Sequence, residues 1–120
     1  MIKHEGIGWR LEKDISRKKY IVLVGGDHFA FELSDQEWEG LRKVISKLIV
    51  ELDSLKDELM AEEKICLELE IYPWWACIDG NRDDWSLNLI LSGENFEGRG
   101  LECFWPIPAG KELVEQMRLM

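Results

Sequence analysis

The turn formed by residues 79–84 has the spacing most typical of a ligand site in this chain. Asp79, Asn81 and Asp83 match the oxygen ligands at the start of an EF-hand calcium loop. Such a loop has glycine at its sixth position and a bidentate glutamate at its twelfth, where this chain has Asp84 and Ile90. We therefore expect a polar hairpin turn here and no calcium site.

Residues that could act in catalysis are sparse and separated along the chain. The two histidines, His4 and His28, fall near the N-terminus and in a hairpin, away from any recognisable nucleophile motif. Gly25-Gly26 follows a strand but opens a hairpin rather than a helix, so it is not a phosphate-binding loop. The pair Glu62-Glu63 is more typical of a solvated helix end than of acid–base catalysis. The sequence thus predicts a non-enzymatic protein without a metal or a cofactor.

The cysteines and the hydropathy pattern predict the cellular compartment. Cys66, Cys77 and Cys103 are odd in number and far apart, which is typical of reduced core residues rather than a disulfide framework. No run of eighteen apolar residues occurs, and residues 1–6 lack the apolar segment of a signal peptide. We expect one cytoplasmic domain over residues 1–120, with no membrane partner.

The first third of the chain has the pattern of a small sheet. Apolar residues alternate with polar ones over residues 7–12, and strongly apolar runs follow at 20–24 and 29–33. Gly25-Gly26-Asp27 supplies a tight hairpin between the last two. These segments predict a three-stranded meander.

A long amphipathic helix is predicted next. Ser34 and Glu37 have the spacing of a capping box. Apolar residues then recur at steps of three and four, in the seam Trp38, Leu41, Ile45, Leu48, Leu52, Leu55 and Leu59. A helix from Asp35 to about Glu62 would be ~42 Å long. The seam can pack across a sheet, or it can extend beyond the sheet and pair with a second copy. Because exposed leucine costs roughly 25 cal/mol per Å², we favour a homodimer in which Leu52 and Leu55 contact the partner.

The second half of the chain repeats the order of sheet and helix. Alternation predicts strands at 65–72, 74–78, 85–91 and 101–105, and a terminal helix from about Ala109. The order βββ-α-ββββ-α indicates an α+β fold whose helices cover one side of antiparallel sheet. The opposite side should then be mainly acidic and carry Arg10, Glu12, Glu32, Glu68, Glu70, Asn88 and Glu102.

Tryptophan is abundant, with six residues in 120. Four of them fall at positions of core parity: Trp9, Trp38, Trp85 and Trp105. Trp74 and Trp75 are adjacent in a strand, so their side chains point to opposite faces. We expect one of these two to lie at a partner surface, since large exposed aromatic residues favour binding interfaces.

Charge distribution limits the classes of partner. The net charge is −9, and the acidic excess falls entirely within residues 34–120. This balance disfavours nucleic acid as a partner without excluding it. The basic run Lys13, Arg17, Lys18 and Lys19 is interpreted either as a solvated loop or as a clamp for a phosphate, such as that of a nucleic acid, or for a carboxylate.

Several segments together resemble a small uncharacterised family of cyanobacterial proteins. They are Gly8-Trp9-Arg10, residues 24–33 (VGGDHFAFEL) with Glu37-Trp38, residues 58–63 (ELMAEE), Trp85-Ser86-Leu87, residues 98–102 (GRGLE) and Trp105-Pro106. The resemblance implies a fold similar to the Whirly-type single-stranded-DNA-binding transcriptional regulators, also describable as cystatin-like. It implies no catalytic residue and no cofactor.

Two functions are therefore expected. The first is an acidic interaction or assembly module of the cytosol that binds an unknown protein partner. The alternative is a single-stranded nucleic-acid-binding or transcription-regulatory protein, which rests on the fold similarity and on the basic run.

Overall fold

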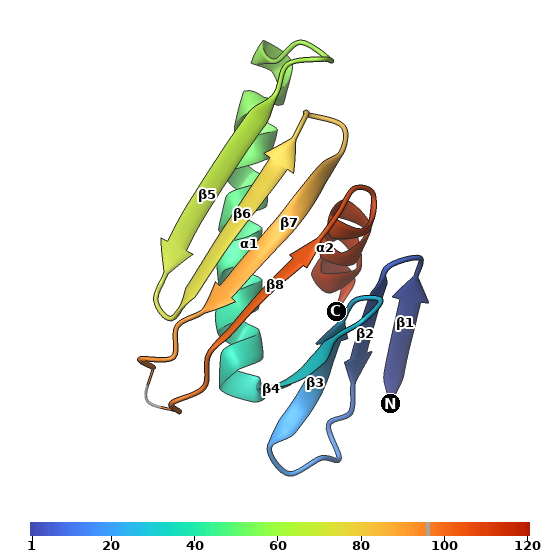
Figure 1. Cartoon of the computed structure of the whole chain (residues 1–120), viewed down its shortest axis with the longest axis vertical. Coiled ribbons are helices and arrows are strands. Elements are labelled where there is room, and N and C mark those ends of the chain that lie inside the picture. Colours follow the sequence, from blue (N-terminus) through green and yellow to red (C-terminus); the bar gives the residue numbers. More distant parts are fainter. Residues whose placement is uncertain (96) are drawn as a thin grey trace.

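The computed structural model describes residues 1–95 and 97–120. It contains two four-stranded antiparallel sheets and two helices, in the order sheet, helix, sheet, helix (Figure 1). This arrangement confirms the predicted α+β class with one long and one C-terminal helix. The prediction of three strands before the long helix was wrong by one strand.

The first sheet is a meander of strands β1 (Ile2–Gly6), β2 (Trp9–Lys13), β3 (Tyr20–Gly25) and β4 (Ala30–Ser34). Strand β1 was not predicted, because this edge strand buries none of its residues and therefore lacks an apolar alternation. Gly8, with a φ of 87°, allows the tight turn that joins β1 to β2.

The long helix α1 (Asp35–Leu55) starts where the capping box predicts. The Ser34 hydroxyl accepts a hydrogen bond from the Glu37 amide, and the Glu37 carboxylate accepts one from the Ser34 amide. The helix ends at Leu55 rather than near Glu62, and a short 3₁₀ turn, η1 (Lys56–Glu58), follows it. The last turn of α1 has no basic residue, and Asp57 and Glu58 follow it. In a longer helix these negative charges would lie near the negative end of the helix dipole, which disfavours further extension.

The second sheet has the order β5 (Ile65–Ile71), β6 (Trp74–Gly80), β7 (Trp85–Leu91) and β8 (Leu101–Trp105). Strand β7 alternates at every position between a fully buried residue and a half-buried one. Helix α1 packs on β5 and β6, on the side of the sheet where Ile65, Trp74, Ala76 and Ile78 are buried. The predicted acidic side is thus divided between two sheets, because Arg10, Glu12 and Glu32 belong to the first sheet.

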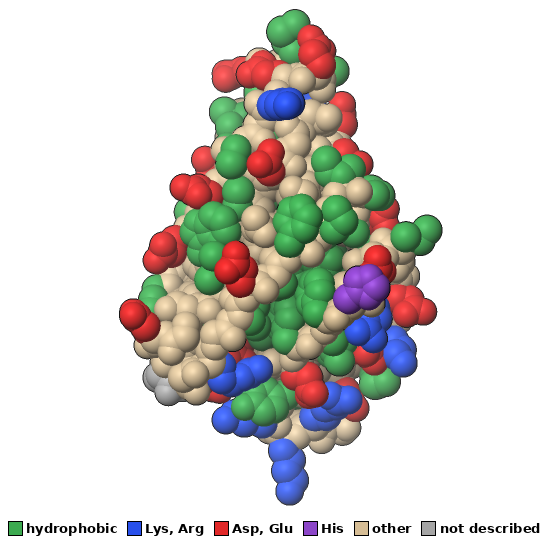
Figure 2. Space-filling model, in the orientation of Figure 1, with side chains coloured by type: hydrophobic (Ala, Val, Ile, Leu, Met, Phe, Trp, Pro, Cys, Tyr) green, Lys and Arg blue, Asp and Glu red, His purple; other side chains and the backbone are tan. Residues whose placement is uncertain are grey.

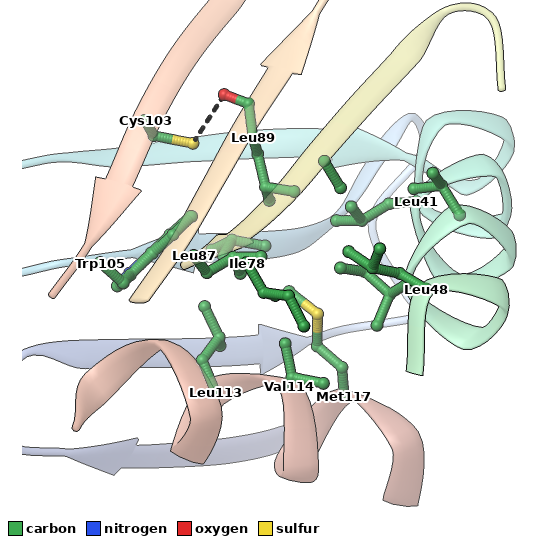
Figure 3. Packing of buried hydrophobic residues seen from close by; sticks show 14 of the residues in the cluster. Leu41, Leu48, Ile78, Leu87, Leu89, Cys103, Trp105, Leu113, Val114 and Met117 are labelled. Atoms are coloured by element: carbon green, nitrogen blue, oxygen red, sulfur yellow. Dashed lines mark hydrogen bonds between the residues drawn. The ribbon is translucent and has the colours of Figure 1, made fainter. Parts of the chain in front are cut away.

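The C-terminal helix α2 (Ala109–Leu119) contacts strands of both sheets. Leu113, Val114 and Met117 point from α2 toward the side chains of the second sheet (Figure 3). At Gly110 the helix approaches β7 so closely that a Cβ atom there would lie 2.7 Å from the Leu87 backbone nitrogen. None of the helices in the described part of the chain is long and apolar enough to cross a membrane.

The tryptophans predicted for the core are buried, as expected: Trp9, Trp38, Trp85 and Trp105. Trp105 also joins the two sheets, because its indole Nε1 donates a 3.0 Å hydrogen bond to the Gly25 carbonyl. The rings of Phe29 and Phe31 lie 5.3 and 6.3 Å from the Trp105 ring, centre to centre. One hydrophobic cluster therefore includes residues of both sheets and both helices.

Candidate protein-binding face

The second sheet leaves one side uncovered by the helices of the chain. We call this side the outer face; its residues are Cys66, Glu68, Glu70, Trp75, Cys77, Asp79, Ser86, Asn88, Ile90, Glu102 and Phe104. The alternation of each strand produces it, since every second residue turns inward to the core. Figure 1 is viewed onto this face, with α1 behind the sheet.

Strand register brings apolar and acidic side chains into one row across the outer face. Glu70 pairs with Trp75, Trp75 with Ile90, and Ile90 with Glu102. Side chains directly opposite in an antiparallel sheet are neighbours, so a carboxylate stands at each end of a two-residue apolar centre. Phe104 lies in the adjacent row and is 50% exposed.

The outer face is apolar in its middle and acidic around it. Figure 2 shows hydrophobic side chains grouped over the centre of the sheet, with acidic ones around them. A hollow of about 310 Å³ opens here and is lined by Glu70, Pro73, Trp74, Trp75, Ile90 and Ser92. The strands β5 to β8 include four acidic residues, Glu68, Glu70, Asp79 and Glu102, and no lysine or arginine. None of these four carboxylates forms an ion pair with a residue that the structure describes.

The two adjacent tryptophans point to opposite faces, as predicted. Trp74 is fully buried, and its indole Nε1 donates a 3.0 Å hydrogen bond to the Glu37 carbonyl of α1. Trp75 is half-buried on the outer face. Of this pair, only Trp75 can contact a partner, while Trp74 fixes the strand to the helix behind it.

The leucine seam lies inside the protein. Leu52 is 1% exposed, and Leu55 is half-buried at the end of α1. The expectation that these two leucines overhang the sheet rested on a longer helix than the structure contains. They therefore present no exposed seam for a second copy.

The basic run is largely engaged within the chain. Arg17 forms a 3.0 Å ion pair with Glu32, and Lys19 lies 3.7 Å from Glu97. Lys13 is half-buried at the end of β2, whereas Lys18 is exposed and without an ion pair among the described residues. Among the described residues, Lys18 is thus the exposed cation of this segment that has no ion-pair partner.

Two of the three thiols, those of Cys77 and Cys103, are unsuited to nucleophilic chemistry. The Sγ atoms of Cys66 and Cys77 are 3.7 Å apart on the outer face. Burial, helped by the hydrogen bond with Cys66, raises the pKa of Cys77 to about 12. Burial likewise raises the pKa of Cys103 to about 12. Because the thiolate is the reactive form, Cys77 and Cys103 are inert near neutral pH.

Other candidate ligand positions have structural partners. The Asn81 side chain accepts hydrogen bonds from the amides of Asp83 and Asp84, which closes the turn between β6 and β7. In the described part of the chain, no group of three or more histidine, cysteine or carboxylate side chains is placed to hold a metal ion.

An ion pair between distant segments was not apparent from the sequence. Arg99 donates a hydrogen bond of 2.5 Å to the buried Glu37 carboxylate, and its guanidinium lies 4.5 Å from the centre of the Tyr20 ring. Phe104 and Ile90 were also missed as surface residues, although Phe104 shares the strand parity of Glu102. That parity was the signal that could have identified Phe104.

Comparison with known proteins identifies the family but no activity. No curated protein matches the chain. A crystal structure of a protein with unknown function from the DUF155 family of Prochlorococcus sp. NATL2A has a TM-score of 0.90 and 42% sequence identity. The match covers 100% of this chain and 98% of that one. The family described as a domain of unknown function, DUF1818, matches residues 4–120, and the chain therefore belongs to that family.

Proposed function

We propose that this protein is a non-enzymatic interaction module that binds a basic, partly apolar segment of another protein on its outer face. The observation that supports this most strongly is the row Glu70, Trp75, Ile90 and Glu102, where two carboxylates flank an apolar centre. An aromatic anchor with a charged surround is typical of protein interfaces. In a segment with alternating lysine and apolar side chains, the lysines would contact the carboxylates of the row and the apolar side chains would contact Trp75 and Ile90.

Charge complementarity favours such a partner over a second copy. Two outer faces packed together would bring four carboxylates of one copy toward four of the other, with no lysine or arginine on either set of strands. Like charges placed opposite each other across an interface cost several kcal/mol. A basic partner gains attraction instead and associates faster at low salt.

The same surface argues against nucleic acid at this position, because carboxylates repel phosphates. Single-stranded nucleic acid remains the alternative at the loop between β2 and β3, which Lys18 supports with an unpaired charge. Figure 2 shows most of the blue basic side chains of this view at the lower end of the molecule, away from the apolar centre of the outer face. The two functions therefore predict different binding positions.

A fluorescence titration with a short synthetic peptide of alternating lysine and leucine tests the proposal. The double substitution Glu70→Lys and Glu102→Lys should weaken binding at least about tenfold, since each interface charge pair contributes about 1 kcal/mol or more. The matched control is Glu51→Lys with Asp57→Lys, which makes the same charge change at exposed positions of α1 and η1. Equal weakening by both variants would mean that only net charge matters and would overturn the proposal.

A further inference from the structure

A second cavity lies behind the outer face, where the loop after β7 passes the start of α1. Its volume is about 220 Å³, and its described lining residues are Gln36, Glu37, Tyr72, Pro73, Trp74, Asn95 and Glu97. Among these described residues, two carry carboxylates and none carries a positive charge. Pro73 and Trp74 separate this cavity from the hollow on the outer face, because both residues line both spaces.

The Glu37 carboxylate is buried and only half satisfied. The side chain is 6% exposed. Its Oε1 atom accepts hydrogen bonds from the Ser34 amide at 2.8 Å and from Arg99 at 2.5 Å. Its Oε2 atom is buried and has no hydrogen-bond partner among the described residues. A buried acceptor left without a partner is costly, and Glu37 lines the cavity, so a donor that enters the cavity can supply the missing hydrogen bond to this side chain.

Glu97 supplies a second acceptor of the same kind. Its Oε2 atom is also buried without a hydrogen-bond partner in the described part of the chain. The nearest cation is the Lys19 ammonium at 3.7 Å, which is too long for a hydrogen bond, and the Lys19 side chain is 61% exposed. Lys19 is thus a loosely held charge that a better-placed donor can replace.

The remaining walls of the cavity are apolar and held in place. Tyr72, Pro73 and Trp74 form one wall. The Tyr72 hydroxyl donates a 2.8 Å hydrogen bond to the Glu94 carbonyl, and the Trp74 indole donates one to the Glu37 carbonyl. Aromatic rings tolerate a cation well and also pack against an alkyl chain. The Asn95 side-chain Nδ2 donates hydrogen bonds to the carbonyls of Ser92 and Arg99. Its amide nitrogen therefore stabilises the loop and is not available to a ligand.

From these contacts we propose that the cavity binds a primary ammonium group on a short alkyl stem. The N–H groups would donate to the carboxylates of Glu37 and Glu97, which line the cavity, and the stem would lie against Tyr72 and Trp74. A volume several times that of a water molecule, about 30 Å³, accommodates a chain of a few carbons. This inference does not rest on the outer face, and the two sites can fail separately.

Titration of the ¹⁵N-labelled protein with n-butylammonium chloride tests the proposal, with the Trp74 indole resonance as the local probe. We expect a saturable shift with a dissociation constant on the order of millimolar, the range open to so small a ligand. n-Butanol has the same stem without the charge and should not shift this resonance at equal concentration. Equal shifts with butanol, or ammonium-induced shifts confined to other sites, would overturn the proposal.

Substitutions of neighbouring carboxylates supply a matched control. Glu97→Gln should weaken butylammonium binding about tenfold or more, because a hydrogen bond to a charged acceptor is replaced by a weaker one. Glu94→Gln removes an exposed carboxylate from the same loop that does not line the cavity, and it should leave the affinity within about twofold. Lys19→Ala should tighten binding a few-fold by removing the competing ammonium. Equal effects of the two glutamate substitutions would contradict the assignment.

A final comparison identifies the source of the amine. If N-acetyl-lysine methylamide shifts the Trp74 resonance as n-butylammonium does, the cavity accepts a lysine side chain of a polypeptide. If only the free amine binds, the ligand is a small molecule. Absence of a shift with both compounds overturns the proposal.

Discussion

The ion pair between Arg99 and Glu37 should contribute more to the free energy of unfolding than most other single interactions in the chain. Arg99→Ala would leave the Glu37 carboxylate, which is 6% exposed, with the Ser34 amide as its one hydrogen-bond donor among the described residues. Removing one partner of a buried ion pair costs about 3–5 kcal/mol. Because the Arg99 side chain is 30% exposed, water can enter when it is removed, and we reduce the expected loss to about 2–4 kcal/mol. The substitution also removes a hydrogen bond to the Glu32 carbonyl and the contact with the Tyr20 ring.

Urea unfolding followed by circular dichroism measures this loss. Arg17→Ala is the matched control, since it removes an exposed ion pair with Glu32 whose side chains are 45% and 47% exposed. That pair should contribute no more than about 1 kcal/mol. Adding Glu37→Gln to Arg99→Ala should recover part of the stability, because the stranded charge disappears. If Arg99→Ala and Arg17→Ala destabilise equally, the reasoning about the buried carboxylate is refuted.

The further predictions concern the core and the thiols. Gly110→Ala should lower the free energy of unfolding by about 2–3 kcal/mol despite the helix preference of alanine, because the new Cβ meets the Leu87 backbone; stability unchanged in a urea titration would contradict this. Leu52→Ala should cost about 2–5 kcal/mol and leave the oligomeric state unchanged by light scattering, since the residue is buried within one chain. Iodoacetamide at pH 8.5 should modify exposed Cys66 in the native protein but Cys77 only in urea. Because the folded pKa of Cys77 is raised to about 12, the protonated thiol favours folding fully below the unfolded pKa of about 8.5, and this contribution is lost as pH rises toward 12.

Local sequence patterns predicted much of the fold. The capping box at Ser34 and Glu37 located the start of α1, because both of its hydrogen bonds are made within four residues. The alternation in β7 predicted which of its residues enter the core. The end of α1 was missed for two reasons. The leucine spacing continues through Leu59, and no glycine or proline marks the end of the helix. The acidic residues that follow Leu55 were the available signal.

The sites were predictable only in part. Adjacent tryptophans in one strand must point to opposite faces, which predicted that one of Trp74 and Trp75 lies at the surface. Only the structure shows that this residue is Trp75. The partnership of Arg99 with Glu37 joins residues 62 positions apart, so no local pattern encodes it. The cavity beside Glu37 arises from the same long-range packing of a loop on a helix start. Such a site becomes visible only when the register of the sheet places Tyr72 and Trp74 next to α1.

The most direct test of the proposed function is a chemical-shift map of the ¹⁵N-labelled protein, titrated separately with the lysine–leucine peptide and with oligothymidine. The account predicts that the peptide shifts Glu70, Trp75, Ile90 and Phe104 most, and that the shifts decrease as salt is raised. Oligothymidine should leave those four residues unchanged. Peptide-induced shifts spread over the whole surface, or oligothymidine binding at Lys18 with no response of the outer face to the peptide, would contradict it.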